Sequence, residues 1–258
     1  MRNLAIVALT GTLLLIASTG TAQTWSERVY VSVNGAFQST TNDFGDRFEF
    51  DKDLETGSTD VDYRVGSGVV FDGGGGVRLW KNFGVGAAVS VFNRKNPADT
   101  TTRSPHPFLF NQGREVTGAA DDITRTETAV HVQAMYFLAT SGHLRVVLSG
   151  GPTFFRLKQD LVSEVALTET FPYDTAAFST VRKQTITGTA PSFNVGADVV
   201  WMLRPGFGVG GLVRFSRASI DLDAPVSRAS SELNAPSNRT VSVDGGGIYA
   251  GGGIRLLF

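Results

Sequence analysis

Residues 193–216 read FNVGADVVWMLRPGFGVGGLVRFS, two runs of alternating side chains joined by a tight turn. In each run, apolar residues occupy every second position, and mostly polar or small residues stand between them. Because successive side chains of a β-strand point to opposite faces, each run predicts a strand with one apolar and one polar face. The Arg204-Pro205-Gly206 sequence between the runs has the residue types of a turn. The segment therefore predicts an antiparallel β-hairpin.

The same alternation appears in eight segments spread over the chain. Their apolar positions fall within residues 29–37, 61–79, 83–91, 128–138, 144–154, 193–203, 207–215 and 248–258. Repeated alternation in segments of about ten residues is the sequence signature of a transmembrane β-barrel, weak in one segment but informative in eight. We therefore expect an all-β fold, an eight-stranded antiparallel transmembrane β-barrel.

The connections between the segments alternate between short and long. The short ones contain the turn-forming residues Lys81-Asn82, Thr140-Ser141-Gly142 and Arg204-Pro205-Gly206. The long ones are polar and cover approximately residues 39–59, 95–125, 159–188 and 218–240. Loops of that length are uncommon in a compact soluble domain. Short periplasmic turns and four long extracellular loops are instead the plan of an outer-membrane barrel.

A soluble lipocalin-like barrel is the alternative, and it would place its apolar face inward around a ligand. The polar face would then be the outside of the protein. That face is rich in glycine, and its few charged residues include Asp72, Arg78, Arg145, Asp198, Arg214 and Arg255. It is too sparsely charged for a soluble exterior, so the sequence favours an apolar face turned toward lipid.

Composition excludes several classes of protein. The chain has 258 residues, a formal net charge of −1 and no cysteine. The lack of cysteine excludes a disulfide scaffold, thiolate metal sites and a cysteine nucleophile. Balanced charge argues against nucleic acid as a partner. After the N-terminus no run approaches 18 consecutive apolar residues, which excludes membrane-spanning helices.

The N-terminus has the three parts of a secretory signal peptide. Arg2 precedes an apolar run from Leu4 to Ala17, and the small residues Gly20-Thr21-Ala22 follow. The run is shorter than the roughly 20 residues that a transmembrane helix needs. We therefore expect residues 1–22 to be a signal peptide for export through the inner membrane, and residues 23–258 to be the barrel domain.

The mature chain resembles the small eight-stranded outer-membrane barrels, the group that contains the OmpA transmembrane domain and related surface barrels. The resemblance rests on the signal segment, the eight alternating segments and the last strand, Ile254-Arg255-Leu256-Leu257-Phe258. In that family, a terminal aromatic residue is the signal read by the barrel-assembly machinery, which implies this role for Phe258. The resemblance also implies a monomer in the bacterial outer membrane, surrounded by lipid and lipopolysaccharide.

The polar faces of the strands predict a charged network inside the barrel. Buried charges are stable only when they are paired and hydrogen-bonded. If the hairpin of residues 193–216 forms, Asp198 lies diagonal to Arg214 and within reach of its long side chain. The residues expected in this lumen network are Asp72, Arg78, Glu127, His131, Arg145, Asp198, Arg214 and Arg255.

Candidate catalytic and metal-binding residues are few. His106 lies beside Ser104 in the second long loop, which is the side on which an outer-leaflet lipid-modifying enzyme would act. Acidic residues crowd the first long loop, but without the spacing of a calcium site. A loop histidine near a serine is common by chance, and solvated loop charge explains the acids. We therefore predict no catalytic residue, no cofactor and no metal site.

Two classes of function remain for such a barrel. Side chains about fill an eight-stranded interior, which favours a closed structural scaffold whose extracellular loops contact an unidentified ligand. The alternative is a porin-like passive conduit for small or hydrophobic molecules, for which the apolar lumen-facing residues Phe137, Val147, Val200 and Met202 give some support. A lipid-modifying enzyme is the less favoured third hypothesis.

Overall fold

In the computed structural model of the chain, residues 27–39, 41–138, 142–225 and 238–258 are described. The expected signal peptide, residues 1–22, lies outside this part, as do two residues of the expected turn at 140–142. In the described part, no helix is long and apolar enough to cross a bilayer. The regular structure there consists of β-strands.

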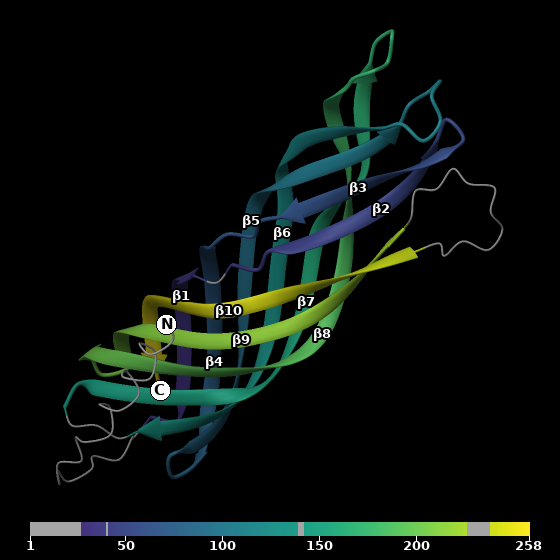
Figure 1. Cartoon of the computed structure of the whole chain (residues 1–258). Helices are drawn as coiled ribbons and strands as arrows, with labels where there is room; N and C mark the ends of the chain where they lie inside the picture. Colours follow the sequence, from purple (N-terminus) through teal and green to yellow (C-terminus); the bar gives the residue numbers. More distant parts are fainter. Residues whose placement is uncertain (1–26, 40, 139–141, 226–237) are drawn as a thin grey trace, which may run out of the picture.

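Ten antiparallel strands make up the described structure (Figure 1). They are β1 (Val29–Gln38), β2 (Phe44–Lys52), β3 (Glu55–Tyr63), β4 (Gly68–Trp80), β5 (Phe83–Pro105), β6 (Gly113–Leu138), β7 (Leu144–Glu169), β8 (Ala176–Arg204), β9 (Phe207–Pro225) and β10 (Asn238–Leu257). Eight of them close a ring: β1 pairs with β4, each strand from β4 to β9 pairs with its successor, and β10 pairs with β1. The predicted eight-stranded antiparallel barrel is confirmed.

The remaining strands, β2 and β3, form an additional hairpin within the first predicted loop. β3 pairs with the outer part of β5, where Ser58–Tyr63 lie opposite residues 98–103. The prediction of one strand over residues 61–79 is therefore wrong at its outer end, because the chain leaves strand conformation between Tyr63 and Gly68. Glycine and serine fill much of that break, and glycine weakens a strand because it has no side chain to pack.

The short turns lie at the end of the ring near the C-terminus. Lys81 and Asn82 join β4 to β5, and Pro205 and Gly206 join β8 to β9. Gly206 has a φ of 80°, a conformation that glycine adopts without steric cost. These two turns are confirmed as predicted.

The long connections are mainly paired strands, which corrects the expectation of extended loops. β5 and β6 remain paired out to Pro105 and Gly113, and β7 and β8 remain paired out to Glu169 and Ala176. Figure 1 shows the β2–β3, β5–β6 and β7–β8 hairpins extending well beyond the ring. The connecting turns shrink to residues 106–112 and 170–175.

These extensions have a hydrophobic pattern opposite to that of the ring. On β9, Ile220 and Leu222 are fully buried inside, whereas the intervening Asp221 and Asp223 are exposed. The interior side chains of neighbouring strands join them in one apolar core, which includes Val61, Ile123, Leu157, Leu161, Val162 and Val243. Water surrounds this part of the barrel, so its apolar side chains must face inward to be buried. The extensions are thus held together like a soluble β-structure.

The ring itself carries its apolar side chains on the outside. Exposed apolar residues occur on all eight of its strands, among them Val33, Phe71, Phe83, Val132, Phe154, Val195, Val213 and Ile254. Aromatic side chains pair near both edges of this belt: Phe83 contacts Tyr136, and Phe193 contacts Phe215. An outward apolar band bordered by aromatic rings matches the hydrocarbon layer and interfaces of a bilayer.

The outer core predicts a local stability effect. Replacing the fully buried Ile220 with alanine removes apolar packing and should lower the opening free energy of outer β9 by about 2–5 kcal/mol. The neighbouring exposed Asp221→Ala variant is the matched control and should change it by less than about 0.5 kcal/mol. Hydrogen exchange of the amides of residues 218–224 measures both effects. Equal losses in the two variants would show that this segment has no packed interior.

Candidate functional site

Two ion-pair clusters fill the middle of the barrel, and the first is centred on Asp198. The Asp198 carboxylate accepts hydrogen bonds from Arg255 Nε at 2.9 Å and Nη2 at 3.0 Å, and a further short one from Tyr30 Oη. These residues come from β8, β10 and β1, and all three side chains are buried. The cluster therefore crosses the lumen and connects strands far apart in the sequence.

The second cluster is centred on Asp72. Its carboxylate pairs with Arg214 and also accepts hydrogen bonds from Asn34 Nδ2 and Tyr249 Oη, each at 3.0 Å. Arg214 Nη1 also lies 3.0 Å from Tyr249 Oη. Strands β1, β4, β9 and β10 supply these four residues. Asp72 thus has the multiple partners that a buried carboxylate needs.

The predicted pair of Asp198 with Arg214 is not the pair that forms. Arg214 lies opposite Gly196 on β8, diagonal to Asp198, as the sequence predicts. Its guanidinium nevertheless crosses the lumen to Asp72 on β4, and Asp198 takes Arg255 instead. A narrow closed barrel brings opposite walls within reach of a long side chain, so neighbours along the sheet compete with partners across it.

Neutral polar groups continue the network around His131. The His131 ring nitrogens lie 3.1 Å from Ser90 Oγ and 2.8 Å from Thr153 Oγ1. Asn194 donates to Thr153 Oγ1 at 2.9 Å and accepts from Gln133 at 2.9 Å. The histidine is fully buried and held on both sides by hydroxyl groups.

Glu127 lies toward the outer end of the lumen. It accepts hydrogen bonds from Arg125 Nε at 2.7 Å and from the Gly246 amide at 2.8 Å. The sequence analysis missed Arg125, although this residue is fully buried and also bonds Gln159. Arg125 is separated from Glu127 and His131 by an even number of residues, which would place all three side chains on one face of a strand. The sequence pattern nevertheless assigned Arg125 to a loop.

The other two predicted lumen residues lie at the short-turn end. Arg78 donates to the carbonyl oxygens of Glu27 at 3.1 Å and Lys81 at 3.0 Å. Arg145 donates to the carbonyl oxygens of Gly142 at 2.8 Å and Leu144 at 3.1 Å. Both are partly exposed. They contribute to the rim of the barrel rather than to the two buried clusters.

Apolar side chains close the lumen on both sides of the polar layers. A cluster that includes Met135, Phe137, Val147, Val200 and Met202 lies at the short-turn end, and the core of the extensions lies at the other end. Two internal cavities between the layers have volumes of about 10 Å³ each. Such a volume suits a single water molecule.

Glycines are part of this close packing. The inward positions of β4 and β5 near Met135 include Gly76 and Gly86. A Cβ atom at Gly86 would lie 2.6 Å from the Met135 sulfur, and one at Gly76 would overlap the same atom. The glycine-rich strands therefore make room for the side chains that fill the lumen.

Lumen-facing Phe155 requires no irregularity in its strand. Gly150, Gly151 and Pro152 lie shortly before it on β7. The β6–β7 register is the same on both sides of that segment, with Ala134 opposite Gly150 and His131 opposite Thr153. Phe155 faces inward and belongs to the apolar core of the extensions.

Ion pairs also hold the extensions together. Glu169 Oε1 lies 2.6 Å from both Lys52 Nζ and Arg114 Nη2, which joins the β2–β3, β5–β6 and β7–β8 hairpins. Burial tends to raise the pKa of the Glu169 carboxyl, but hydrogen bonds and charge from the two cations outweigh it. The net result is a pKa below the ordinary value.

A second ion pair in the extensions joins Asp46 to Arg239. Their closest approach is 2.8 Å, and the Arg239 guanidinium also donates to the Val162 carbonyl oxygen at 2.9 Å. Asp46 is one of the acids expected in the first loop, and it is buried and paired rather than solvated. Among the described residues, no group of three or more histidine, aspartate or glutamate side chains could hold a metal ion.

The His106–Ser104 candidate does not have the geometry of a nucleophile and its base. His106 Nδ1 accepts hydrogen bonds from the amides of Phe108 and Leu109, both at 3.1 Å. Its Nε2 faces the Asp174 carboxylate at 3.8 Å. Ser104 Oγ lies 3.5 Å from Lys52 Nζ. The histidine thus organises the 106–112 turn, while the serine contacts a cation.

Phe258 closes the barrel at the short-turn end. Its carbonyl oxygen accepts hydrogen bonds from the amides of Arg28 at 2.5 Å and Val29 at 2.8 Å, and its own amide donates to Val29. Its side chain is exposed on the outside. The last residue therefore completes the seam between the first and last strands.

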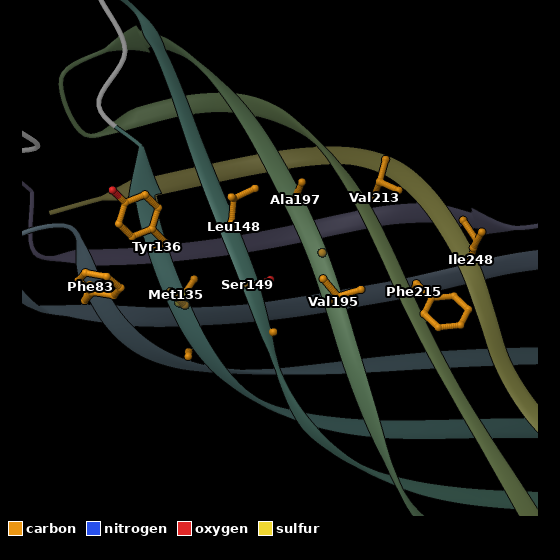
Figure 2. A pocket seen from close by; sticks show the side chains of 13 residues that line it. Phe83, Met135, Tyr136, Leu148, Ser149, Val195, Ala197, Val213, Phe215 and Ile248 are labelled. Carbon is orange, nitrogen blue, oxygen red and sulfur yellow. The ribbon is translucent and has the colours of Figure 1, made fainter. Parts of the chain in front are cut away.

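A groove of about 620 Å³ lies on the lipid-facing side of β6, β7 and β8 (Figure 2). Small residues such as Ala134, Gly150 and Ala197 form its floor, and larger apolar side chains border it, among them Phe83, Tyr136, Leu148, Phe215 and Ile248. Because it lies within the apolar belt, lipid chains can fill it.

These features define a class of protein. A closed antiparallel ring with an apolar outer belt and a polar, filled interior is a transmembrane β-barrel of the outer-membrane type. Ring closure pairs the backbone along every strand edge, and the belt gives the outside the polarity of a bilayer core.

Three solved structures of outer-membrane and surface proteins are similar to this chain. The outer membrane protease OmpT from Escherichia coli matches with a TM-score of 0.51 and 9% sequence identity, over 93% of this chain and 100% of that chain. OprG from Pseudomonas aeruginosa matches with a TM-score of 0.46 and 10% identity, over 90% and 96% of the two chains. Neisserial surface protein A matches with a TM-score of 0.45 and 12% identity, over 89% and 97%.

The likeness to OmpT supports the outer-membrane barrel fold. At 9% identity it says nothing about a shared activity. No protein-family model and no curated protein matches the chain.

The lowered pKa of Glu169 predicts a pH effect on the extensions. A carboxyl whose pKa is lowered by folding contributes stability above its unfolded pKa of about 4.3, and that stability is lost as the pH falls through the folded pKa. Glu169→Gln should therefore increase pepsin cleavage within residues 106–112 and 170–175 at pH 5, with the difference from wild type shrinking toward pH 2.

Glu115→Gln is the matched control for this prediction, because Glu115 pairs with Arg103 in an exposed position on the neighbouring β5–β6 hairpin. Exposed pairs contribute little, so its cleavage should follow wild type. A Glu169→Gln difference that is independent of pH would contradict an effect through the carboxylate charge.

Proposed function

We propose that the chain is a closed outer-membrane scaffold that presents its extended hairpins to partners outside the cell. The filled lumen is the observation that carries this proposal. Two buried ion-pair clusters and a polar layer lie between two apolar layers, and the internal cavities suit single water molecules. Because side chains fill the lumen, the structure favours a role as a scaffold over a role in transport.

The passive conduit receives less support from the same residues. Phe137, Val147, Val200 and Met202 face the lumen, as a route for hydrophobic molecules would require. They pack against one another in a single cluster at the short-turn end, with little free space. We therefore assign them to the seal of the barrel.

We also propose that the scaffold has no enzymatic activity. His106 is the histidine nearest the outer turns, and two backbone amides occupy its Nδ1 atom. Ser104 is hydrogen-bonded to Lys52 instead of to the histidine. A nucleophile needs a base within hydrogen-bond reach, and this pair does not supply one.

We propose the route of export and assembly that the sequence predicts. Residues 1–22 would direct the chain through the inner membrane, and the barrel-assembly machinery would then read Phe258 during insertion into the bacterial outer membrane. The apolar belt supports contact with outer-membrane lipid and lipopolysaccharide, and a ring closed by the strands of one chain supports a monomer.

Planar-bilayer recordings test the closed scaffold. The purified mature chain should show no stable single-channel conductance, because layered side chains block the lumen. Replacing Met135, Phe137 and Met202 together with alanine removes only the layer at the short-turn end and should leave the chain closed, because the ion-pair clusters and the outer core still fill the lumen. Stable, large currents from the wild-type chain would refute the scaffold and favour the conduit.

The assembly role of Phe258 is tested separately. Phe258→Asp should reduce the amount of barrel in the outer membrane several-fold, while a barrel already folded in detergent should keep its thermal stability within a few degrees. The side chain is exposed, so its loss removes little packing. Phe154→Asp introduces the same charge at another exposed aromatic residue of the apolar belt, so it controls for the effect of a charge in the belt by itself. Equal outer-membrane levels of wild type and Phe258→Asp would contradict a signal at this residue.

A further inference from the structure

The outer turns of three hairpins gather several large apolar side chains in water. Leu54 in the β2–β3 turn is 94% exposed, and Phe171 in the β7–β8 turn is 83% exposed. Phe108 and Phe110 in the β5–β6 turn are 69% and 67% exposed, with Leu109 between them. We call these five residues the apolar tip. Exposed clusters of large apolar side chains on an aqueous surface mark interaction sites.

Contacts between the hairpins hold the apolar tip in one place. The Asn111 amide donates to Glu55 Oε1 at 2.7 Å, which joins the β5–β6 turn to the β2–β3 turn. Arg114 Nη1 donates to the Tyr173 carbonyl oxygen at 3.0 Å, which joins it to the β7–β8 turn. The Glu169 ion-pair cluster lies directly beneath. The three turns therefore form one surface.

Aromatic contacts fix the orientation of the rings. Phe108 packs edge-on against Tyr173 with ring centroids 5.5 Å apart, and Phe171 packs edge-on against the same ring at 6.1 Å. Rigid aromatic side chains lose little conformational entropy when a partner binds, which suits them to serve as anchors. The tip presents such anchors before binding.

Leu54 adds an independent observation. It has a φ of 68° and follows Asp53 at 51°, so both central residues of the β2–β3 turn are in the left-handed region. Glycine or asparagine fits such a turn best. A leucine there is costly to the backbone and gains no burial in the chain itself, as expected of a side chain that a partner covers.

The surroundings of the apolar tip are acidic. Residues 51–56, 103–115 and 169–175 hold six carboxylates and three cations, a formal charge of −3. Two of the cations, Lys52 and Arg114, are tied to Glu169, and Arg103 pairs with Glu115. Asp51, Asp53 and Asp174 are exposed around the apolar side chains. This field attracts a cationic partner and repels an anionic lipid surface.

We infer that the apolar tip binds a cationic amphipathic polypeptide segment, whose apolar face packs on Leu54, Phe108, Phe110 and Phe171 and whose basic residues face the acidic rim. The inference rests on the proposed function and names the chemistry of the partner. Apolar anchors supply affinity, and the complementary rim supplies association rate and selectivity.

The test uses the mature chain in lipid nanodiscs and fluorescence anisotropy. The probe is a synthetic amphipathic helical peptide of leucine and lysine, and the comparison peptide carries glutamate in place of every lysine. The Phe108→Ser/Phe110→Ser/Phe171→Ser variant should bind the lysine peptide at least tenfold more weakly than wild type. These side chains are exposed, so the variant keeps its fold, which circular dichroism verifies.

Charge variants test whether binding depends on the exposed carboxylates around the apolar tip or on acidic side chains anywhere on the chain. Asp53→Asn/Asp174→Asn should weaken lysine-peptide binding at least threefold, whereas Asp121→Asn/Asp221→Asn, exposed acids away from the tip, should leave it unchanged. The glutamate peptide should bind the wild-type chain no more tightly than it binds the triple-serine variant. Equal binding of both peptides, or lysine-peptide binding that does not depend on the three phenylalanines, would overturn the inference.

Vesicle flotation separates a polypeptide partner from a membrane. Phosphatidylcholine vesicles that bind wild type but not the triple-serine variant would assign the tip to a lipid surface and overturn the inference. Conductance is an independent readout of the proposed function. If the chain binds the lysine peptide and also conducts, the closed scaffold is refuted but the binding role of the apolar tip is not. If the chain does not conduct and does not bind the peptide, the binding role of the tip is refuted but the closed scaffold is not.

Discussion

The structure depends on backbone hydrogen bonding in a medium without water. Unpaired backbone groups are costly in hydrocarbon, so strands can cross a bilayer only as a closed ring. Here the closing seam lies between β1 and β10, where Tyr30 pairs with Leu257 and Gln38 with Tyr249. The hydrogen bonds of Phe258 extend the same seam by one residue. The apolar belt, the enclosed lumen and the position of the outer hairpins follow from this closure.

Solvent changes along the strands, and the side-chain pattern changes with it. Within the bilayer, Val213 and Phe215 of β9 face outward, and Arg214 faces the lumen. A few residues further along the same strand, Ile220 and Leu222 face inward and Asp221 faces water. Strand geometry continues without interruption, but the favourable side for apolar groups is reversed. The chain thus joins a membrane barrel to an apolar core of the kind found in soluble proteins, and this core lies inside the hairpins that carry the outer turns.

The buried charges support the proposal that this eight-stranded ring is closed rather than porous. Asp72 and Asp198 each have an arginine and a tyrosine as partners, and these partners come from strands that are not adjacent to the strand of the carboxylate. Removing one member of such a cluster leaves an uncompensated buried charge, which is strongly destabilising. The same contacts that stabilise the ring therefore occupy the space that a solute would need.

The alternation of residues 193–216 and its repetitions are sufficient to predict the strands, their number in the ring, the short turns and the outward direction of the apolar face. These properties depend on the two-residue period of a strand, which is local. The partner of Arg214, the burial of Arg125 and the role of Phe155 are not local, because they depend on which walls face each other across the lumen. The sequence also predicts residues 218–240 as a polar loop, although Ile220 and Leu222 alternate there in the opposite sense to the ring. Only the tertiary structure shows that those side chains share an interior, because their burial requires strands from distant parts of the chain to meet beyond the bilayer.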